Sequence, residues 1–312
     1  MRHLFALAVL CGAMAAGAQE TTACATAGNN NTFLNIQTIR LWEGAAPEAR
    51  GTSCDDIPTL TILAPRKGAE NGSAVIVLPG GGYAHLAGDL EGREVGDWFA
   101  ARGFRAFVLS YRLTSHGYAL PVPLYDARRA VQLVRAHAAE YRIDPQRIAM
   151  IGFSAGGHLA GLAGTQFVEG KPEAADPVER VSSRPDYLIL GYAWLGAVSL
   201  DTTHLNYCKV FKLMDQCDAL SKAYTPELFV SSKTPPTFIY HTYTDQTVPV
   251  SQALGFFNAL LKNGVPAEMH VFGHGAHGTG LGRGDAALDQ WPNLLENWLR
   301  AQGLLTAQKV AH

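Results

Sequence analysis

The chain has 312 residues, of which 47% are hydrophobic and 17% are charged, and its formal net charge at pH 7 is −2. This length and apolar content suit one large domain with an extensive core. The nearly neutral, dispersed charge argues against the basic surfaces of proteins that bind nucleic acid or membrane surfaces, so we expect neither as a partner. The sequence does not determine the oligomeric state.

The N-terminal segment has the form of a secretory signal peptide. Arg2 and His3 provide a positive end, LFALAVL an apolar centre, and Ala16-Gly17-Ala18 an A-x-A cleavage site. The apolar stretch is shorter than the about 20 residues that span a bilayer. We therefore expect residues 1–18 to be removed, and residues 19–312 to form a single secreted or periplasmic domain.

Four cysteines remain after this segment, namely Cys24, Cys54, Cys208 and Cys217. An even number of cysteines in an oxidising compartment predicts two disulfides. Three pairings are possible, and proximity in the sequence favours Cys24 with Cys54 and Cys208 with Cys217. Zinc is the alternative, but the chain has no C-x-x-C pair to support it, and we predict no metal site.

Short apolar runs then alternate with amphipathic stretches, a pattern typical of parallel strands joined by helices. The predicted strands are TLTILAP (59–65), AVIVLPG (74–80), RAFVLSY (105–111), RIAMIGF (147–153), YLILGYAW (187–194), TFIYHTY (237–243) and AEMHVF (267–272). The predicted helices cover residues 91–102, 124–141, 155–167, 250–263 and 287–302. Strands such as AVIVL lack alternation, as expected when both sheet faces are covered. We predict an α/β fold with a doubly wound, mostly parallel sheet and helices on both faces.

The segment IGFSAGGH (151–158) matches G-x-S-x-G between a predicted strand and a predicted helix. At such a turn the serine backbone is strained, and the residues two positions away must lack side chains. Gly152 and Gly156 occupy those positions. The pattern predicts Ser154 as a nucleophile whose hydroxyl is lifted clear of the sheet.

The glycine-rich run PGGGY (79–83) follows another predicted strand. Consecutive glycines let backbone N–H groups approach a ligand and stabilise the oxyanion of a tetrahedral intermediate. We predict an oxyanion hole formed by the amides of Gly81, Gly82 and Ala155. A plain turn or a phosphate-binding loop is the alternative, but the run does not continue as G-x-G-x-x-G.

The residues that follow two further predicted strands include a candidate acid and two candidate bases. Asp245 follows TFIYHTY, where a carboxylate can orient a histidine. An ordinary helix-capping role is its alternative. His274 and His277 follow AEMHVF, and one of them should be the general base. Their three-residue spacing also fits a metal site, but a third ligand of matching spacing is missing.

Tyr83 and Trp194 follow two of the predicted strand ends and are candidates for the walls of a substrate pocket. Core packing is the more common role for a residue such as Trp194. Residues 195–234 lack clear periodicity and contain two of the cysteines. This stretch is a possible small cap or insertion over the site.

Five motifs, LPGGGY, SYRL, GFSAGGHLA, HTYTDQTVPV and HVFGHGAHGTGL, resemble in order those of α/β-hydrolase esterases of the BD-FAE and acetylxylan esterase-like group, which is related to hormone-sensitive lipase-type esterases. The resemblance extends from about residue 60 to about residue 299. It implies Ser154 as nucleophile, Asp245 as acid and His277 as base. His277 is preferred over His274 because the family's catalytic histidine is followed by glycine and lies nearer the tip of its loop.

One departure concerns Pro79, which stands where lipase-like relatives carry the histidine of HGGG. With this proline, the chain resembles the carbohydrate esterases more than the lipase-like relatives. The resemblance thus implies a secreted serine esterase that needs no cofactor and hydrolyses acyl esters, above all acetyl esters, of carbohydrates such as xylan. The alternatives are a feruloyl esterase, a serine peptidase related to prolyl oligopeptidases, and a non-catalytic carbohydrate-binding member of the fold.

Overall fold

The computed structural model describes residues 24, 37–196, 215 and 217–305. The expected signal peptide, residues 1–18, lies outside this part of the chain. Within the described residues, no helix has both the length and the apolar character needed to cross a membrane.

A mixed sheet forms the centre of the molecule, with its strands in the order β1-β2-β4-β3-β5-β6-β7-β8. The strands are β1 (Gln37–Arg40), β2 (Thr59–Leu63), β3 (Ala74–Leu78), β4 (Arg105–Ser110), β5 (Ile148–Phe153), β6 (Tyr187–Gly191), β7 (Thr237–Thr242) and β8 (Ala267–Phe272). Strands β3 to β8 pair in parallel, whereas β2 is antiparallel to both of its neighbours. The predicted α/β fold is confirmed, since each predicted strand is present.

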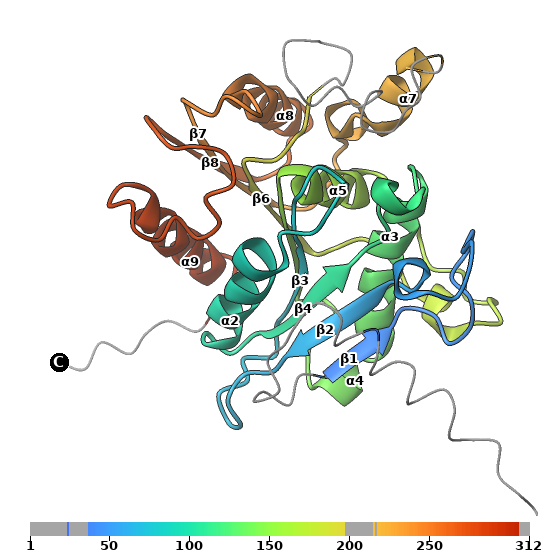
Figure 1. The fold of residues 1–312 in the computed structure, drawn as a ribbon. Coiled ribbons are helices and arrows are strands. Elements are labelled where there is room, and N and C mark those ends of the chain that lie inside the picture. Colours follow the sequence, from blue (N-terminus) through green and yellow to red (C-terminus); the bar gives the residue numbers. More distant parts are fainter. Residues whose placement is uncertain (1–23, 25–36, 197–214, 216, 306–312) are drawn as a thin grey trace, which may run out of the picture.

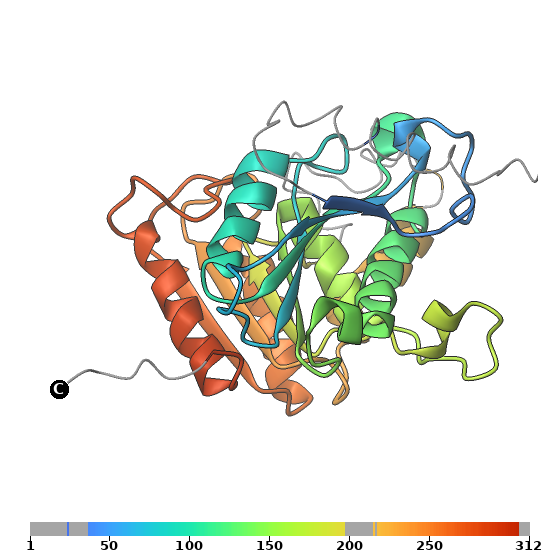
Figure 2. The ribbon, with the colours of Figure 1, turned by 90° about the horizontal axis from the view of Figure 1, so that it is seen from below.

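Helices cover both faces of this sheet (Figures 1 and 2). One face packs against α2 (Glu94–Ala100) and α9 (Trp291–Ala301), and the other against α3 (Val122–Ala136), α5 (Ser154–Thr165) and α8 (Val250–Lys262). Two further helices are α4 (Ala138–Tyr141) and α7 (Cys217–Tyr224). The central strands β3 and β5 are buried along their whole length, which explains their unbroken apolar sequence.

The predicted boundaries need several corrections. Strand β6 ends at Gly191 rather than at Trp194, because Tyr192 has a φ of 33° and leaves the extended conformation. The first three residues of the predicted helix 91–102 belong to a π-helical segment, Gly88–Arg93, and α2 itself covers Glu94–Ala100. The predicted helix 124–141 is interrupted at His137, which separates α3 from α4.

A disulfide joins Cys24 to Cys54, in the pairing that sequence proximity favours. Cys217 is also disulfide-bonded. Cys208, its predicted partner, lies outside the described residues.

A buried ion pair connects the segment that follows β4 with α3. Arg112 and Asp126 have side chains that are 1% and 0% exposed, and Nη2 of the arginine lies 2.6 Å from Oδ1 of the carboxylate. The Arg112 Nη1 group donates to the carbonyl oxygen of Pro47 at 2.6 Å. The guanidinium therefore ties the segment between β1 and β2 to the body of the sheet.

Removing one partner of this pair leaves the other charge buried without compensation. We expect Asp126→Asn to lower the free energy of unfolding by about 3–5 kcal/mol, measured by urea denaturation. The control is Asp97→Asn, whose carboxylate is 50% exposed and 3.6 Å from Arg93. This exposed pair should contribute about 1 kcal/mol or less. Equal stability of the two variants would contradict the assignment.

Candidate active site

Ser154 lies on a sharp turn between β5 and α5. Its φ is 51°, in the left-handed region that non-glycine residues adopt rarely. A Cβ added to Gly152 would lie 2.3 Å from the carbonyl oxygen of Gly156, and one added to Gly156 would lie 2.2 Å from that of Leu78. Only glycine fits at both positions, as the motif predicts.

The three side chains predicted for acid, base and nucleophile lie in one hydrogen-bonded chain. His277 Nε2 is 2.7 Å from Ser154 Oγ, and His277 Nδ1 is 2.7 Å from Asp245 Oδ2. A carboxylate only accepts, so Nδ1 carries the proton and Nε2 is free to accept from the serine hydroxyl. The three residues follow β5, β7 and β8, whose carboxyl ends meet at the same edge of the sheet.

Asp245 is held in a fully buried position by further donors. Its Oδ1 atom accepts from the backbone amides of Thr247 at 2.8 Å and Val248 at 2.9 Å, and its side chain is 0% exposed. Burial alone would raise the pKa of Asp245, but the hydrogen bonds from His277 and from these amides outweigh it and hold the pKa below its ordinary value. The carboxylate therefore stays ionised at neutral pH.

The run of glycines after β3 adopts a backbone that turns its amides in an unusual direction. Gly81, Gly82 and Tyr83 have φ values of 121°, 62° and 59°. Among the hydrogen bonds within the described residues, the amides of Gly81 and Gly82 have no acceptor. The amide of Ala155 belongs to the first turn of α5, where N–H groups lack intrahelical acceptors. All three predicted oxyanion-hole donors are thus available.

Tyr83 and Trp194 do not form an open pocket wall, and this expectation is corrected. Their exposed fractions are 0% and 1%, and both belong to the main hydrophobic cluster. The Tyr83 hydroxyl lies 2.7 Å from Nδ1 of His158, and the Trp194 ring packs on the His158 imidazole with centroids 5.1 Å apart. These aromatic residues support helix α5 from within the core.

His158 completes this cluster behind the nucleophile. Its Nε2–H group donates to the carbonyl oxygen of Tyr224 at 2.8 Å, so Nδ1 accepts from the Tyr83 hydroxyl. Burial lowers the pKa of His158 to about 4, which keeps the imidazole neutral. His158 is therefore a buried packing residue of the core.

His274, the other candidate base, points elsewhere. Its side chain is 67% exposed, and Nε2 lies 3.5 Å from Oδ2 of Asp285. Within the part of the chain that the structure describes, no group of three or more histidine, cysteine or acidic side chains is arranged to hold a metal ion.

Two residues beside the hydrogen-bonded acid, base and nucleophile are not predicted from the sequence. Tyr192 packs the edge of its ring against His277, with centroids 5.0 Å apart, and its hydroxyl lies 2.7 Å from Oε1 of Glu91. Glu91 is only 3% exposed. A single acidic residue in an amphipathic stretch gives no sequence signal of such burial.

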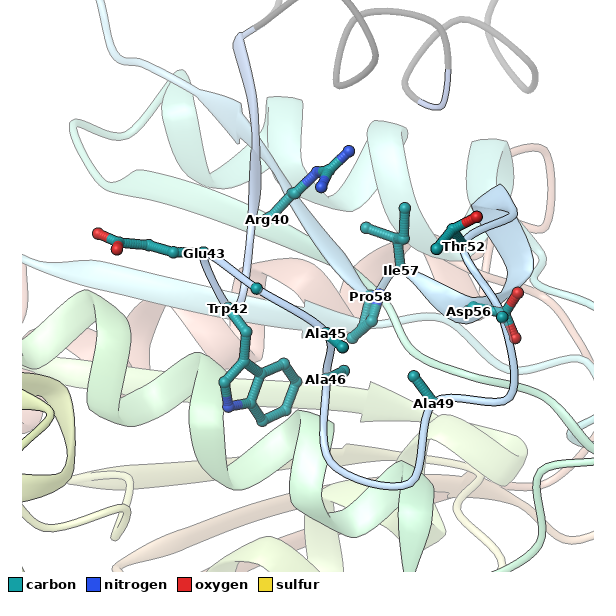
Figure 3. Close-up of a pocket in the computed structure, with 12 residues that line it drawn as sticks. Arg40, Trp42, Glu43, Ala45, Ala46, Ala49, Thr52, Asp56, Ile57 and Pro58 are labelled. Carbon is teal, nitrogen blue, oxygen red and sulfur yellow. The ribbon is translucent and has the colours of Figure 1, made fainter. Parts of the chain in front are cut away.

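A separate hollow of about 230 Å³ lies beside the segment between β1 and β2 (Figure 3). Its walls come from the end of β1 and the segment that leads to β2, and include Trp42, Ala46, Ala49 and Pro58. None of the described residues that line it is Ser154, His277 or Asp245.

Comparison with known proteins identifies relatives of this chain. The family model BD-FAE matches residues 60–260. The chain is 36% identical over 210 residues to "Endo-1,4-beta-xylanase B" of Butyrivibrio fibrisolvens, covering 65% of this chain and 32% of that protein. It is 31% identical over 237 residues to "Acetylxylan esterase" of Xylanibacter ruminicola, covering 74% and 46%. The chain thus spans between about a third and a half of these curated relatives.

Solved structures match over nearly their whole length. An acetyl ester-xyloside bifunctional hydrolase from Caldicellulosiruptor lactoaceticus has a TM-score of 0.79 and 39% identity, with 86% of this chain and 97% of that chain covered. A propionate-bound esterase, Est2, from Thermogutta terrifontis has a TM-score of 0.71 and 28% identity, with 88% and 96% covered. These neighbours share the fold.

The turn at Ser154 generates a testable consequence. Gly156→Ala places a methyl group against rigid backbone, so the serine must shift. A displacement of about 1 Å at a reacting atom lowers turnover by about 100-fold, and we expect this loss in kcat for an activated acyl ester. Gly164→Ala is the control on the same helix, because its Cβ would meet only the Leu188 side chain at 3.1 Å. Wild-type kcat in Gly156→Ala would show that the close contact is not needed.

Proposed function

Because the chain belongs to the BD-FAE family, we propose that it is a serine esterase that hydrolyses acyl esters of carbohydrates, above all acetyl esters of a xylan-type polysaccharide. The observation that carries this proposal is the chain of hydrogen bonds from Ser154 through His277 to Asp245, with both distances at 2.7 Å. This is the arrangement that activates a hydroxyl nucleophile.

The proposed reaction proceeds by acyl transfer. His277 Nε2 takes the proton of Ser154 as Oγ attacks the ester carbonyl carbon. The tetrahedral intermediate then collapses as the bond to the sugar oxygen breaks, and that oxygen receives the proton and leaves as a hydroxyl group. Water, deprotonated by the same nitrogen, then attacks the acyl-enzyme, and the carboxylic acid leaves as the Ser154 hydroxyl is restored. The step requires no cofactor.

The charges of the site favour this sequence of proton transfers. The ionised Asp245 accepts from Nδ1–H and stabilises the imidazolium that forms when Nε2 takes the proton. The amides of Gly81, Gly82 and Ala155 are assigned to the developing oxyanion. Preorganised donors of this kind contribute about 3–4 kcal/mol each to transition-state stabilisation.

The substrate class rests on the relatives. One curated relative carries the name acetylxylan esterase, and one structural neighbour is described as an acetyl ester-xyloside hydrolase. The signal-like N-terminus and the Cys24–Cys54 disulfide fit an exported enzyme that meets an extracellular polysaccharide. Of residues 195–234, which the sequence predicts as a small cap or insertion, the structure describes 195–196, 215 and 217–234, and α7 lies among them.

The nucleophile assignment predicts that Ser154→Ala lowers the turnover of p-nitrophenyl acetate by more than about 10⁴-fold. The fold should be retained, since a hydroxyl is replaced by hydrogen in a rigid turn, and circular dichroism with a thermal melt tests this. Ser182→Ala, which removes a hydroxyl on an exposed loop, is the control and should keep wild-type turnover. An active Ser154→Ala protein would refute the mechanism.

The substrate assignment predicts which acid is released from natural polymers. Incubated with acetylated xylan, acetylated pectin and feruloylated arabinoxylan in parallel, the enzyme should release acetate from the xylan fastest, measured by chromatography of the free acids. The Ser154→Ala protein provides the blank. Faster release of ferulate would replace the acetyl assignment by a feruloyl one.

A further inference from the structure

Glu91 is a buried acid that the proposed mechanism does not use. It lies in the π-helical segment Gly88–Arg93 and is 3% exposed. Its Oε2 atom accepts from the backbone amide of Gly80 at 2.7 Å, and its Oε1 atom accepts from the Tyr192 hydroxyl at 2.7 Å. Gly80 is the residue before the first proposed oxyanion-hole donor. One oxygen of this carboxylate is therefore bound to the glycine run, residues 79–83, which we call the oxyanion loop.

Tyr192 connects this carboxylate to the other half of the site. It follows β6, is 1% exposed, and its hydroxyl oxygen accepts from the amide of Gly280 at 2.8 Å. Gly280 lies three residues after His277, in the segment 273–282 that we call the histidine loop. The same aromatic ring packs edge-on against the His277 imidazole at 5.0 Å between centroids. Tyr192 thus touches the histidine loop at two points.

The carbonyl group of Gly280 is also held by hydrogen bonds. Its carbonyl oxygen accepts from the Tyr240 hydroxyl at 2.9 Å and from Trp291 Nε1 at 3.2 Å. Its φ is 53°, and an added Cβ would lie 2.8 Å from the Leu90 side chain. Gly280 is therefore the point where the histidine loop is anchored, and one of its three hydrogen bonds leads back to Glu91.

We propose that Glu91 is a positioning residue for the ester hydrolysis: through Tyr192 it holds the oxyanion loop and the histidine loop in fixed relation to each other. The inference rests on the proposed serine esterase mechanism. Within the described residues, the hydrogen bonds of Glu91 go to Gly80 and Tyr192 rather than to Ser154, His277 or Asp245. Its role is to keep the Gly81 and Gly82 amides and His277 Nε2 directed at the same carbonyl group.

A carboxylate is the group that this position requires. Two donors, an amide N–H and a phenolic O–H, point at it from different loops, and each of its oxygens accepts one of them. Glutamine offers one oxygen and one NH₂ group, so one donor would face another donor. Burial raises the pKa of Glu91, while the hydrogen bonds from Tyr192 and Gly80 act in the opposite direction.

The inference distinguishes positioning from simple stabilisation. A residue that only stabilises the fold changes the fraction of folded protein, and the folded molecules keep their kcat. A residue that aligns the oxyanion donors with the base changes the transition state more than the bound substrate, so kcat falls while KM stays nearly constant. The affinity for a trifluoromethyl ketone, whose adduct with the serine carries an oxyanion, should fall in parallel.

The test compares Glu91→Gln, Tyr192→Phe and the double variant with the wild type on p-nitrophenyl acetate, with rates expressed per titrated active site. We expect each single variant to lose about 10- to 100-fold in kcat, less than the loss of a whole oxyanion-hole donor, with KM within about two-fold. Because both side chains belong to one linkage, the double variant should lie within about three-fold of the poorer single variant.

Two matched controls are available. Asp89→Asn makes the same carboxylate-to-amide change in the same segment, on a side chain that is 76% exposed. Tyr187→Phe removes a phenolic hydroxyl from the same strand region, where its contact with the carbonyl of Gln302 is long, at 3.5 Å. Both controls should keep wild-type kcat and KM.

Wild-type kcat in Glu91→Gln and Tyr192→Phe would overturn the inference, and so would fully multiplicative losses in the double variant or a rise in KM at constant kcat. If Glu91→Gln fails to fold, Tyr192→Phe decides alone, because it keeps the aromatic ring and its packing. If Ser154→Ala is inactive while these variants work normally, the positioning role falls and the esterase mechanism stands. An active Ser154→Ala protein removes the mechanism itself.

Discussion

The close contact between helix α5 and the end of strand β3 is the constraint on which the site depends. Gly156 approaches the carbonyl groups of Leu78 and Pro79 so closely that no side chain fits there. This approach holds Ser154 in its left-handed conformation at the head of the helix. Since β3 continues directly into the oxyanion loop, the same contact sets the nucleophile beside the amides proposed to receive the negative charge. The nucleophile and the oxyanion-loop amides are therefore held together by close backbone contact rather than by a side-chain interaction.

The parallel sheet brings the remaining groups to this point. Strands β5, β6, β7 and β8 are consecutive neighbours, so the residues that follow them share one edge. Asp245 and His277 arrive there from positions 32 residues apart, and Ser154 lies 123 residues before the histidine. The buried Asp245 charge is tolerated because two backbone amides and one imidazole donate to it. The strand ends thus supply both the position of the acid and the donors that keep it ionised.

Much of this site is predictable from sequence because its signals are local. The elbow around Ser154, the glycine run at Gly81 and the strand ends before Asp245 and His277 each depend on a few adjacent residues. The strand β1 was missed because it has four residues, none of them fully buried, and so little apolar pattern. The sequence pattern predicts Trp194 in a strand and in a pocket wall, whereas the chain turns at Tyr192 and the indole is buried in the core. An aromatic residue near a strand end has the same sequence signature in either place.

The hydrogen bonds that hold the two loops of the site in place are not predictable in this way, because the residues that form them are distant along the chain. Tyr192 lies 101 residues from Glu91 and 88 residues from Gly280, and two of the four groups in this linkage are backbone amides. The hydrogen bonds that Glu91 receives within the described residues come from neutral donors. A buried carboxylate without a cation contributes less to stability than a well-packed apolar side chain of similar size. Its presence where the oxyanion and histidine loops meet is therefore explained better by the geometry that it imposes on them than by stabilisation of the fold.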